Sequence, residues 1–354
     1  MKPNFWQGRR VFLTGHTGFK GSWLSLWLQS MGADLTGYAL PPSTVPSLFD
    51  VAEVGSGMKS IFGDVRDFEL LKKTLRDSQA EVIFHMAAQP LVRYSYQNPI
   101  ETYSTNVIGT VNLFEAVRLT GQARAVINIT TDKCYKNNEW VWGYRETDTL
   151  GGYDPYSSSK ACSELVTDAM RSSYFNDTDY ERHGVTIASA RAGTVVGGGD
   201  WSEDRLIPDI IRSIIQKKPV HIRNPASVRP WQHVLDPLCG YLTLAERMYE
   251  FGPEYSGAWN FGPSEDDKTV LSIVKRLADL FGDVDWDFDN KTNPHESFSL
   301  RLDCSKSRTK LGWHPKWEIE MALQKIVEWH MSFNIGKSIM KDICLRQISD
   351  YSER

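Results

Sequence analysis

The feature that most constrains the fold is a run of glycines between a short apolar segment and a helical one. Residues 11–13 are three consecutive apolar residues, the pattern of a buried parallel strand. Gly15, Gly18 and Gly21 follow, and an amphipathic helix is predicted to begin at Phe19. The apolar positions of this helix, four residues apart, are Phe19, Trp23, Trp27 and Met31.

Strand, glycine turn and helix form the arrangement that a dinucleotide phosphate needs. Gly15 permits a tight turn, Gly18 lets backbone N–H groups approach a pyrophosphate, and Gly21 lets the helix pack closely on the strand. The N-terminus of the helix then presents unpaired N–H groups to the anion. A strand–turn–helix with incidental glycines is the alternative, and the position and context of these glycines favour the dinucleotide site.

Composition limits the other classes of function. The net charge of −4 argues against a nucleic-acid-binding surface, although a local arginine cluster could still bind an anionic substrate. The five cysteines are scattered and odd in number, which predicts buried thiols in a reducing compartment and neither a disulfide framework nor a metal site. No segment has the pattern of a signal peptide or the length of a membrane span. We therefore expect a cytoplasmic protein that binds no metal, nucleic acid or membrane.

The alternation of strands and helices continues through the first half of the chain. Further strands are predicted at residues 35–40, 59–64, 81–86, 125–130 and 185–190. Helices are predicted at 69–77, 100–120 and 157–174. Repeated strand–helix units of this kind predict an α/β fold, a doubly wound Rossmann-type parallel sheet with helices on both faces.

After residue 194 the alternation becomes irregular. We expect residues 1–194 to form the dinucleotide-binding domain, and residues 195–354 to form a smaller α/β portion that mainly binds substrate, with some return of the chain to the first domain. Helices are predicted at 204–216, 237–250, 269–281 and 318–333, the last of the chain, with short strands at 220–222 and 232–234 and an acidic, turn-rich segment at 283–293.

A tyrosine and a lysine stand at catalytic spacing on one predicted helix. Tyr156 and Lys160 are four residues apart, so they lie on the same helical face. A phenol is a weak base at neutral pH, and an adjacent ammonium stabilises the phenolate, lowers its pKa and can hold a ribose hydroxyl. A chance pair on a solvated helix is the alternative, but a strand that ends in Thr130, Thr131, Asp132 and Lys133 precedes this helix.

Together these residues resemble the extended short-chain dehydrogenase/reductase family over nearly the whole chain. The glycine turn, Asp64–Val65, Ala87–Gln89, Asn106, the Tyr156–Lys160 pair and residues 191–197 match motifs of that family. The resemblance implies NAD as cofactor, bound by Gly15, Thr17, Gly18, Phe19, Lys20, Gly21, Asp64, Val65, Ala87, Ala88, Gln89, Asn106, Thr130, Tyr156, Lys160 and Ala192.

Longer segments resemble the sugar-nucleotide 4,6-dehydratases of that family. They include residues 15–23, 85–93, 131–135, 197–201 and 229–234. The resemblance implies a hydro-lyase that converts CDP-glucose into its 4-keto-6-deoxy form through an internal NAD hydride cycle, in deoxysugar biosynthesis of the lipopolysaccharide O-antigen type. It also implies a homodimer or homotetramer that pairs through helices 100–120 and 157–174.

The resemblance assigns catalytic roles to Thr131, Asp132, Lys133, Tyr156 and Lys160. Asp132 is implied to be the acid at sugar carbon 6, and Thr131 to bond the carbon-4 oxygen. Related dehydratases carry glutamate where this chain has Lys133, which either takes the carbon-5 proton or holds Asp132 in place. The residues implied to bind substrate are Gln89, Thr131, Thr194, Arg205, Leu206, Arg229 and Arg301, the arginines serving the diphosphate.

Two positions depart from the family pattern. The acidic residue expected at the end of the second strand is absent, since Asp34 begins that strand and only Ser43 and Thr44 could offer hydroxyls nearby. Thr194 replaces an asparagine that contacts substrate in related enzymes. The alternatives are another sugar-nucleotide dehydratase or a 4-epimerase on the same scaffold, and a non-catalytic NAD-binding regulator.

Overall fold

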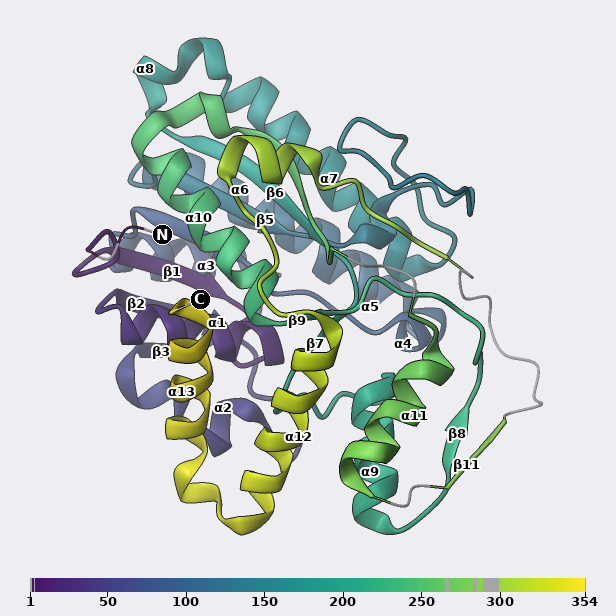
Figure 1. Cartoon of the computed structure of the whole chain (residues 1–354). Helices are drawn as coiled ribbons and strands as arrows, with labels where there is room; N and C mark the ends of the chain where they lie inside the picture. The colour runs from purple at the N-terminus through teal and green to yellow at the C-terminus, as the bar shows by residue number, and fades with distance from the viewer. Residues whose placement is uncertain (1, 3, 265–267, 283–284, 289–298, 354) are drawn as a thin grey trace.

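A computed structural model describes residues 2, 4–264, 268–282, 285–288 and 299–353. Its centre is a seven-stranded parallel sheet in the order β10-β6-β5-β4-β1-β2-β3 (Figure 1). The strands are β1 (Arg10–Thr14), β2 (Asp34–Ala39), β3 (Lys59–Phe62), β4 (Val82–His85), β5 (Ala125–Ile129), β6 (Thr186–Ala192) and β10 (Gly257–Phe261). The predicted doubly wound parallel sheet is therefore confirmed.

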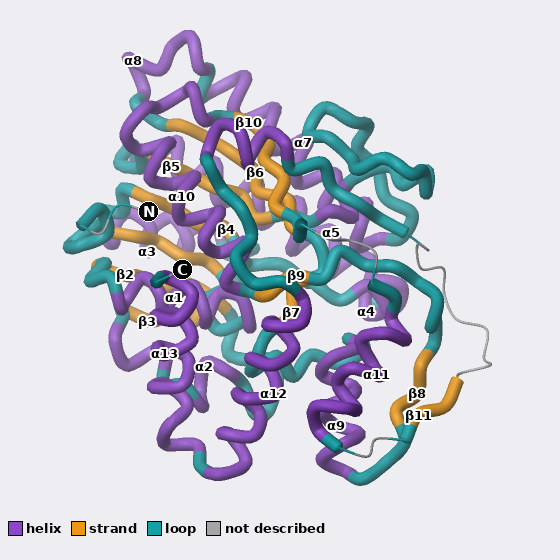
Figure 2. Tube along the Cα trace, in the orientation of Figure 1, coloured by secondary structure: helices purple, strands orange, loops and turns teal. Residues whose placement is uncertain are grey.

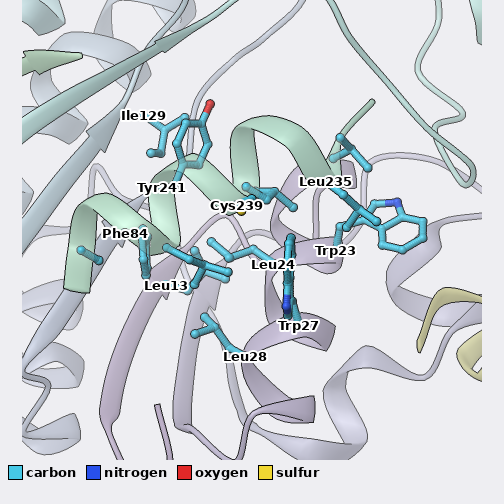
Figure 3. Packing of buried hydrophobic residues seen from close by; sticks show 14 of the residues in the cluster. Leu13, Trp23, Leu24, Trp27, Leu28, Phe84, Ile129, Leu235, Cys239 and Tyr241 are labelled. Carbon is cyan, nitrogen blue, oxygen red and sulfur yellow. The ribbon is translucent and has the colours of Figure 1, made fainter. Parts of the chain in front are cut away.

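Helices cover both faces of this sheet, and each face has its own apolar core. On one face lie α3 (Phe68–Ser78), α6 (Gly109–Thr120) and α7 (Pro155–Tyr174). On the other lie α1 (Phe19–Ser30) and α10 (Leu235–Phe251), which pack on β1, β5 and β6. Figure 3 shows Trp23, Leu24 and Trp27 of α1 among sheet residues and residues of α10. Burial on both faces explains why the strands read as continuous apolar runs.

The shorter elements connect these layers. They are α2 (Leu48–Val51), the 3-10 turn Val54–Gly57, α4 (Val92–Gln97), α5 (Pro99–Tyr103), the π-helical turn Ser104–Ile108, the 3-10 turns Asp132–Cys134 and Asp177–Asp179, and α8 (Tyr180–His183). The predicted helix 100–120 is thus a continuous helical stretch with a π turn inside it.

The third core lies beside the carboxyl edge of the sheet, between elements that follow β6. These are β7 (Val195–Val196), α9 (Leu206–Gln216), β8 (Val220–Ile222), β9 (Gln232–His233), α11 (Val270–Phe281), β11 (Trp286–Phe288) and α12 (Ile319–Ile335). Figure 2 places α9, α11, β8 and β11 together at one side of the molecule. β11 pairs with β8, so the segment predicted as a turn contains a strand, and residues 283–284 and 289–293 lie outside the described residues.

Two expectations for the helices are wrong. The helix at 318–333 is not the last one, because α13 (Met340–Ser352) follows α12. The first helix is not amphipathic, since residues 21–28 are buried on all sides. Helix α13 accounts for both differences. It follows α12 in the chain, and it packs on the outer side of α1, where the Tyr351 and Trp27 rings meet edge to face. Among the described residues, no helix combines the length and hydrophobicity needed to cross a bilayer.

Candidate functional site

The glycine turn is held so tightly that two of its glycines leave no room for a side chain. Gly15 has a φ of +79°, and a Cβ there would lie 2.7 Å from the Ala87 nitrogen. A Cβ on Gly21 would lie 2.0 Å from the Gly15 carbonyl oxygen. Helix α1 starts after Gly18 with no side-chain cap, so its first N–H groups face the turn without a side-chain partner. This geometry suits a phosphate anion.

A threonine at the end of β1 ties the segment after β4 to this turn. The Thr14 hydroxyl oxygen accepts hydrogen bonds from the Met86 and Ala87 N–H groups, each at 3.1 Å. The same hydroxyl lies 2.8 Å from His85 Nδ1. Since both lone pairs of that oxygen are used, its proton goes to His85, and the histidine is neutral because burial lowers its pKa to about 3. Ala87 is therefore fixed beside Gly15.

Asn106 lies in the π-helical turn and connects two parts of the site. Its Oδ1 accepts from the Gln89 N–H at 2.8 Å, and its Nδ2 donates to the Ser159 hydroxyl at 2.8 Å. Ser159 stands between Tyr156 and Lys160 on α7. A π turn locally widens a helix and is frequent at functional sites. The predicted site residues Gln89 and Asn106 are thus joined to the catalytic helix.

Tyr156 and Lys160 lie in the first two turns of α7, which Asp154 caps by accepting from the Ser157 N–H at 2.9 Å. Both side chains are buried. The Lys160 ammonium donates to the Ile129 carbonyl at 3.1 Å, and burial lowers its pKa to about 8. Burial raises the pKa of Tyr156 to about 12, so the expected lowering by Lys160 is not found: desolvation of the phenolate outweighs the Thr131 hydroxyl and the Arg205 charge, which act in the opposite direction.

The predicted tripeptide Thr131–Asp132–Lys133 follows β5 and faces Tyr156. The Thr131 hydroxyl donates to Asp132 Oδ1 at 3.0 Å. Its proximity to Tyr156 opposes the rise in the pKa of the tyrosine. Burial raises the pKa of Asp132, against the influence of Lys133. The Asp132 carboxyl group lies close to Gly193 after β6, since a Cβ on Gly193 would be 3.1 Å from Asp132 Oδ2. Asp132 is thus a buried carboxyl group that holds its proton more readily than an exposed one, in the direction that a proton donor requires.

Lys20 has a second feature that the sequence prediction missed. It was assigned only to the glycine turn, yet burial, Arg205 and Lys160 lower the pKa of its ammonium to about 7. Asp132 and Asp200 act in the opposite direction. The position of Lys20 in the first turn of a helix predicted to face phosphate could have indicated in the sequence that its ammonium group lies in the site. The structure therefore brings the glycine turn and the catalytic residues into one electrostatic environment.

The C-terminal portion supplies the predicted arginines. Arg205 precedes α9 and donates to Asp200 at 3.0 Å, and its charge opposes the rise in the pKa of Tyr156. Arg229 likewise opposes the rise in the pKa of Asp132. The charges of both side chains therefore act on Tyr156 and Asp132, two of the predicted catalytic residues. The backbone of Arg301 instead meets Tyr144, whose N–H donates to the Arg301 carbonyl at 2.9 Å.

Two further predicted substrate residues are Leu206 and Thr194. Leu206 is the first residue of α9 and packs on the third core. Thr194 is half-buried, and its carbonyl accepts from the Gln232 N–H at 3.0 Å, which links β9 to the end of β6.

The adenosine end of the expected cofactor site has no carboxylate at the end of β2. Asp34 pairs with Arg10 in the register of β1 and β2, at the edge opposite the glycine turn. Ser43 is exposed and Thr44 half-buried in the loop that follows β2. Asp64 lies near this end but binds Arg66, which holds the pKa of the carboxyl below its usual range.

A buried ion pair beneath the catalytic residues was not predicted. Glu164 and Arg191 are 2.7 Å apart and almost fully buried. Glu164 stands four residues after Lys160 on the same face of α7, so the spacing Tyr156–Lys160–Glu164 was a signal in the sequence. All five cysteines are free, and Cys162 is only half-buried, unlike the buried thiols expected.

Comparison with known proteins places this geometry in context. The sequence profile of a family described as GDP-mannose 4,6 dehydratase matches residues 12–254. A CDP-glucose 4,6-dehydratase of Salmonella typhimurium is 57% identical over 351 residues, covering 98% of this chain and 97% of the relative. A dTDP-glucose 4,6-dehydratase of Haemophilus influenzae is 24% identical, covering 93% of this chain and 99% of the relative.

Two solved structures have the same fold. A dTDP-glucose 4,6-dehydratase from Bacillus anthracis in complex with NAD has a TM-score of 0.75 at 22% identity, covering 92% of this chain and 97% of the other. A UDP-glucose 4-epimerase from Thermotoga maritima with UDP-glucose has a TM-score of 0.77 at 23% identity, covering 92% and 99%. At these identities, the likeness concerns the fold.

Proposed function

The chain belongs to the GDP-mannose 4,6-dehydratase family, and we propose that it is an NAD-dependent CDP-glucose 4,6-dehydratase. This hydro-lyase converts CDP-D-glucose into CDP-4-keto-6-deoxy-D-glucose and water. The observation that carries the proposal is Asp132, a buried carboxyl group with a raised pKa, close to the tyrosine and threonine that would bond the sugar. A 4-epimerase has no hydroxyl to remove from carbon 6 and needs no such acid. The similarity of the Salmonella relative supports CDP-glucose as the substrate.

The residues of the glycine turn fit NAD. The side-chain-free surface at Gly15 and Gly21 and the uncapped start of α1 would hold its pyrophosphate, with Ala87 and Ala88 alongside. We assign the other predicted cofactor contacts to the same molecule, from Asp64 and Val65 at the adenine to Thr130 and Ala192 at the nicotinamide. When bound there, NAD would supply a reversible hydride acceptor next to the sugar.

Tyr156 and Lys160 would act at sugar carbon 4. Tyr156 takes the proton of the carbon-4 hydroxyl, and Thr131 hydrogen-bonds the same oxygen. Because burial raises the pKa of Tyr156, its phenolate needs stabilisation, which Arg205 and the Thr131 hydroxyl supply in this structure. Lys160, one turn along α7, would hold the ribose hydroxyl beside it. The Lys160 ammonium is itself held by the Ile129 carbonyl at the end of β5. The ketone formed at carbon 4 then acidifies the proton on carbon 5.

Asp132 and Lys133 would perform the elimination. Asp132 gives its proton to the departing carbon-6 hydroxyl. Lys133 either takes the carbon-5 proton or positions Asp132, whose carboxylate it stabilises. Replacing Lys133 with Gln separates these roles: loss of the base would stop water loss while carbon-4 oxidation continues, whereas loss of a positioning residue would slow water loss only partly.

The substrate, assembly and location complete the proposal. Gln89, Thr194, Leu206 and the arginines would bind the sugar nucleotide, the guanidinium groups facing its diphosphate. Helices α5–α6 and α7 would pair two copies into a homodimer or a dimer of dimers. Residues 1–194 would act as the cofactor domain and residues 195–354 mainly as the substrate portion. The enzyme would work in the cytoplasm, supplying deoxysugar precursors of the lipopolysaccharide O-antigen type.

Mass spectrometry of the sugar nucleotide tests this proposal. The purified protein, with NAD, is incubated separately with CDP-, UDP-, dTDP- and GDP-glucose. We expect CDP-glucose to lose the mass of one water and the others to react slowly or not at all. Asp132→Asn should lower kcat by at least about 100-fold, because a transition-state proton donor is lost. Conversion without any mass change would indicate an epimerase, and NAD binding without conversion a regulator.

A further inference from the structure

The buried Glu164–Arg191 pair is absent from the roles proposed above. Its side chains are 3% and 4% exposed, which is rare for charged residues. The pair joins α7 to β6, and further hydrogen bonds are made by both Glu164 oxygens and by Arg191 Nη1. Buried ion pairs often add no stability over apolar residues of similar size, because desolvation offsets their attraction. The specific bonds of this pair therefore call for an explanation other than stability.

Glu164 holds the residue immediately before the catalytic tripeptide. One carboxylate oxygen accepts a hydrogen bond from the Thr130 hydroxyl. The other accepts from the Ser189 hydroxyl and from Arg191 Nη2, both at 2.7 Å. The start of the tripeptide is therefore attached to α7 and β6 through one buried carboxylate, next to the Ile129 carbonyl that Lys160 binds.

Arg191 holds the other end of the same segment. Its Nη1 donates to the Tyr135 hydroxyl at 2.8 Å and to the Glu146 carbonyl at 3.0 Å. Its guanidinium also lies over the Tyr135 ring, 4.9 Å from the ring centroid. The Tyr135 hydroxyl in turn donates to Asn260 Oδ1 on β10 at 2.7 Å. Residues 131–134 therefore lie between two anchors that belong to one ion pair.

We propose that Glu164 and Arg191 are positioning residues that clamp both ends of the Thr131–Lys133 segment and so fix Asp132 against the sugar. The inference rests on the proposed function, and it concerns the elimination step more than the oxidation at carbon 4. Oxidation relies chiefly on Tyr156 and Lys160 of α7, and only the Thr131 hydrogen bond to the carbon-4 oxygen comes from the clamped segment. Elimination uses the clamped tripeptide, where a displacement of about 1 Å can cost roughly 100-fold in rate.

The test compares two variants with a matched control. Glu164→Gln removes the negative charge of the pair. Tyr135→Phe removes the hydroxyl that Arg191 binds at the far end of the segment and leaves the ring. The control is Asp168→Asn, the same carboxylate-to-amide change one turn further along α7, where the side chain is exposed and bonds Arg171. If Glu164→Gln does not fold, Tyr135→Phe, compared with the same Asp168→Asn control, carries the test.

Two measurements are made on each variant. In a single turnover with CDP-glucose and NAD, we expect both variants to accumulate reduced cofactor and the 4-keto sugar, with elimination slowed about 10- to 100-fold and oxidation much less. In the protein without ligands, amide hydrogen exchange of residues 131–135 should become faster. Asp168→Asn should match the wild type in both measurements.

The outcomes separate this inference from the proposed function. If elimination and oxidation slow equally, or if exchange at residues 131–135 is unchanged in both variants, the clamp does not position the tripeptide and the inference is overturned. If the wild type fails to dehydrate CDP-glucose, the proposed function fails, whereas the exchange measurement still shows whether the pair holds the segment.

Discussion

At the scale of single residues, the sequence predicted site residues that are spaced along one element. It did not predict contacts between residues of different elements. The three glycines and the Tyr156–Lys160 pair could be found because each set lies within one turn or one helix. The Glu164–Arg191 pair and the pKa of Tyr156 could not, because both depend on how α7 packs against β5 and β6. Burial opposes the stabilisation of the phenolate that helical spacing suggested.

The close contact at Gly21 predicts a specific loss of cofactor binding. In Gly21→Ala, the Cβ would meet the Gly15 carbonyl oxygen at 2.0 Å, so the turn must open. We expect the affinity for NAD, measured by calorimetry, to fall at least about 100-fold, because displaced backbone donors no longer converge on the pyrophosphate. Gly336→Ala is the control, since nothing lies within 4 Å of its Cβ position. Unchanged NAD affinity in Gly21→Ala would contradict the phosphate site.

At the scale of elements, most strands and helices could be predicted within two or three residues, and the exceptions have a common cause. Helix α1 contains the expected apolar stripe, but α13 also buries its opposite side. Likewise β10 was missed because Gly257–Phe261 begins with glycine and lies in the irregular part of the chain, and it becomes a strand by pairing with β6. Local pattern cannot report a partner that arrives from a distant part of the chain.

Asp236 connects α10 to α13 and predicts a pH-dependent stability. Its Oδ1 accepts from the Tyr351 hydroxyl and the Lys316 N–H, each at 2.7 Å, and its Oδ2 is buried without a partner. Burial raises its pKa from 3.8 to about 6. Because the folded-state pKa is the higher one, the contribution of this group to stability is full below the unfolded value and is lost as pH rises through about 6.

Asp236→Asn keeps the accepting oxygen and removes this titration. Relative to the variant, the wild type should lose about 2 kcal/mol of unfolding free energy between about pH 4 and pH 8. Urea unfolding of both proteins at the two pH values measures this difference. A stability difference that does not change with pH would contradict the raised pKa.

At the scale of the whole molecule, the alternation of strands and helices was enough to predict the doubly wound sheet. It did not reveal that β10, after the irregular segment, completes the sheet next to β6. In the structure, the outer surface of α5–α6 and α7 carries exposed apolar side chains. There Ile100, Ile108 and Leu165 are 85%, 51% and 58% exposed.

These exposed residues predict where two copies meet. Charges at Ile108→Glu and Leu165→Glu together would bury unpaired carboxylates in the proposed dimer, so we expect the double variant to be monomeric by light scattering. Ile215→Glu is the control, an equally exposed isoleucine, 53%, at the end of α9. An unchanged mass for the double variant would place the interface elsewhere.

The most direct test of the central claim follows one hydrogen atom. CDP-glucose carrying deuterium at carbon 4 is converted by the enzyme with NAD, and the product is analysed by NMR and mass spectrometry. The internal redox cycle predicts a 4-keto-6-deoxy sugar that retains the deuterium at carbon 6. Release of the deuterium to solvent or to free cofactor, or its retention at carbon 4 of an unchanged or epimerised sugar, would contradict the account.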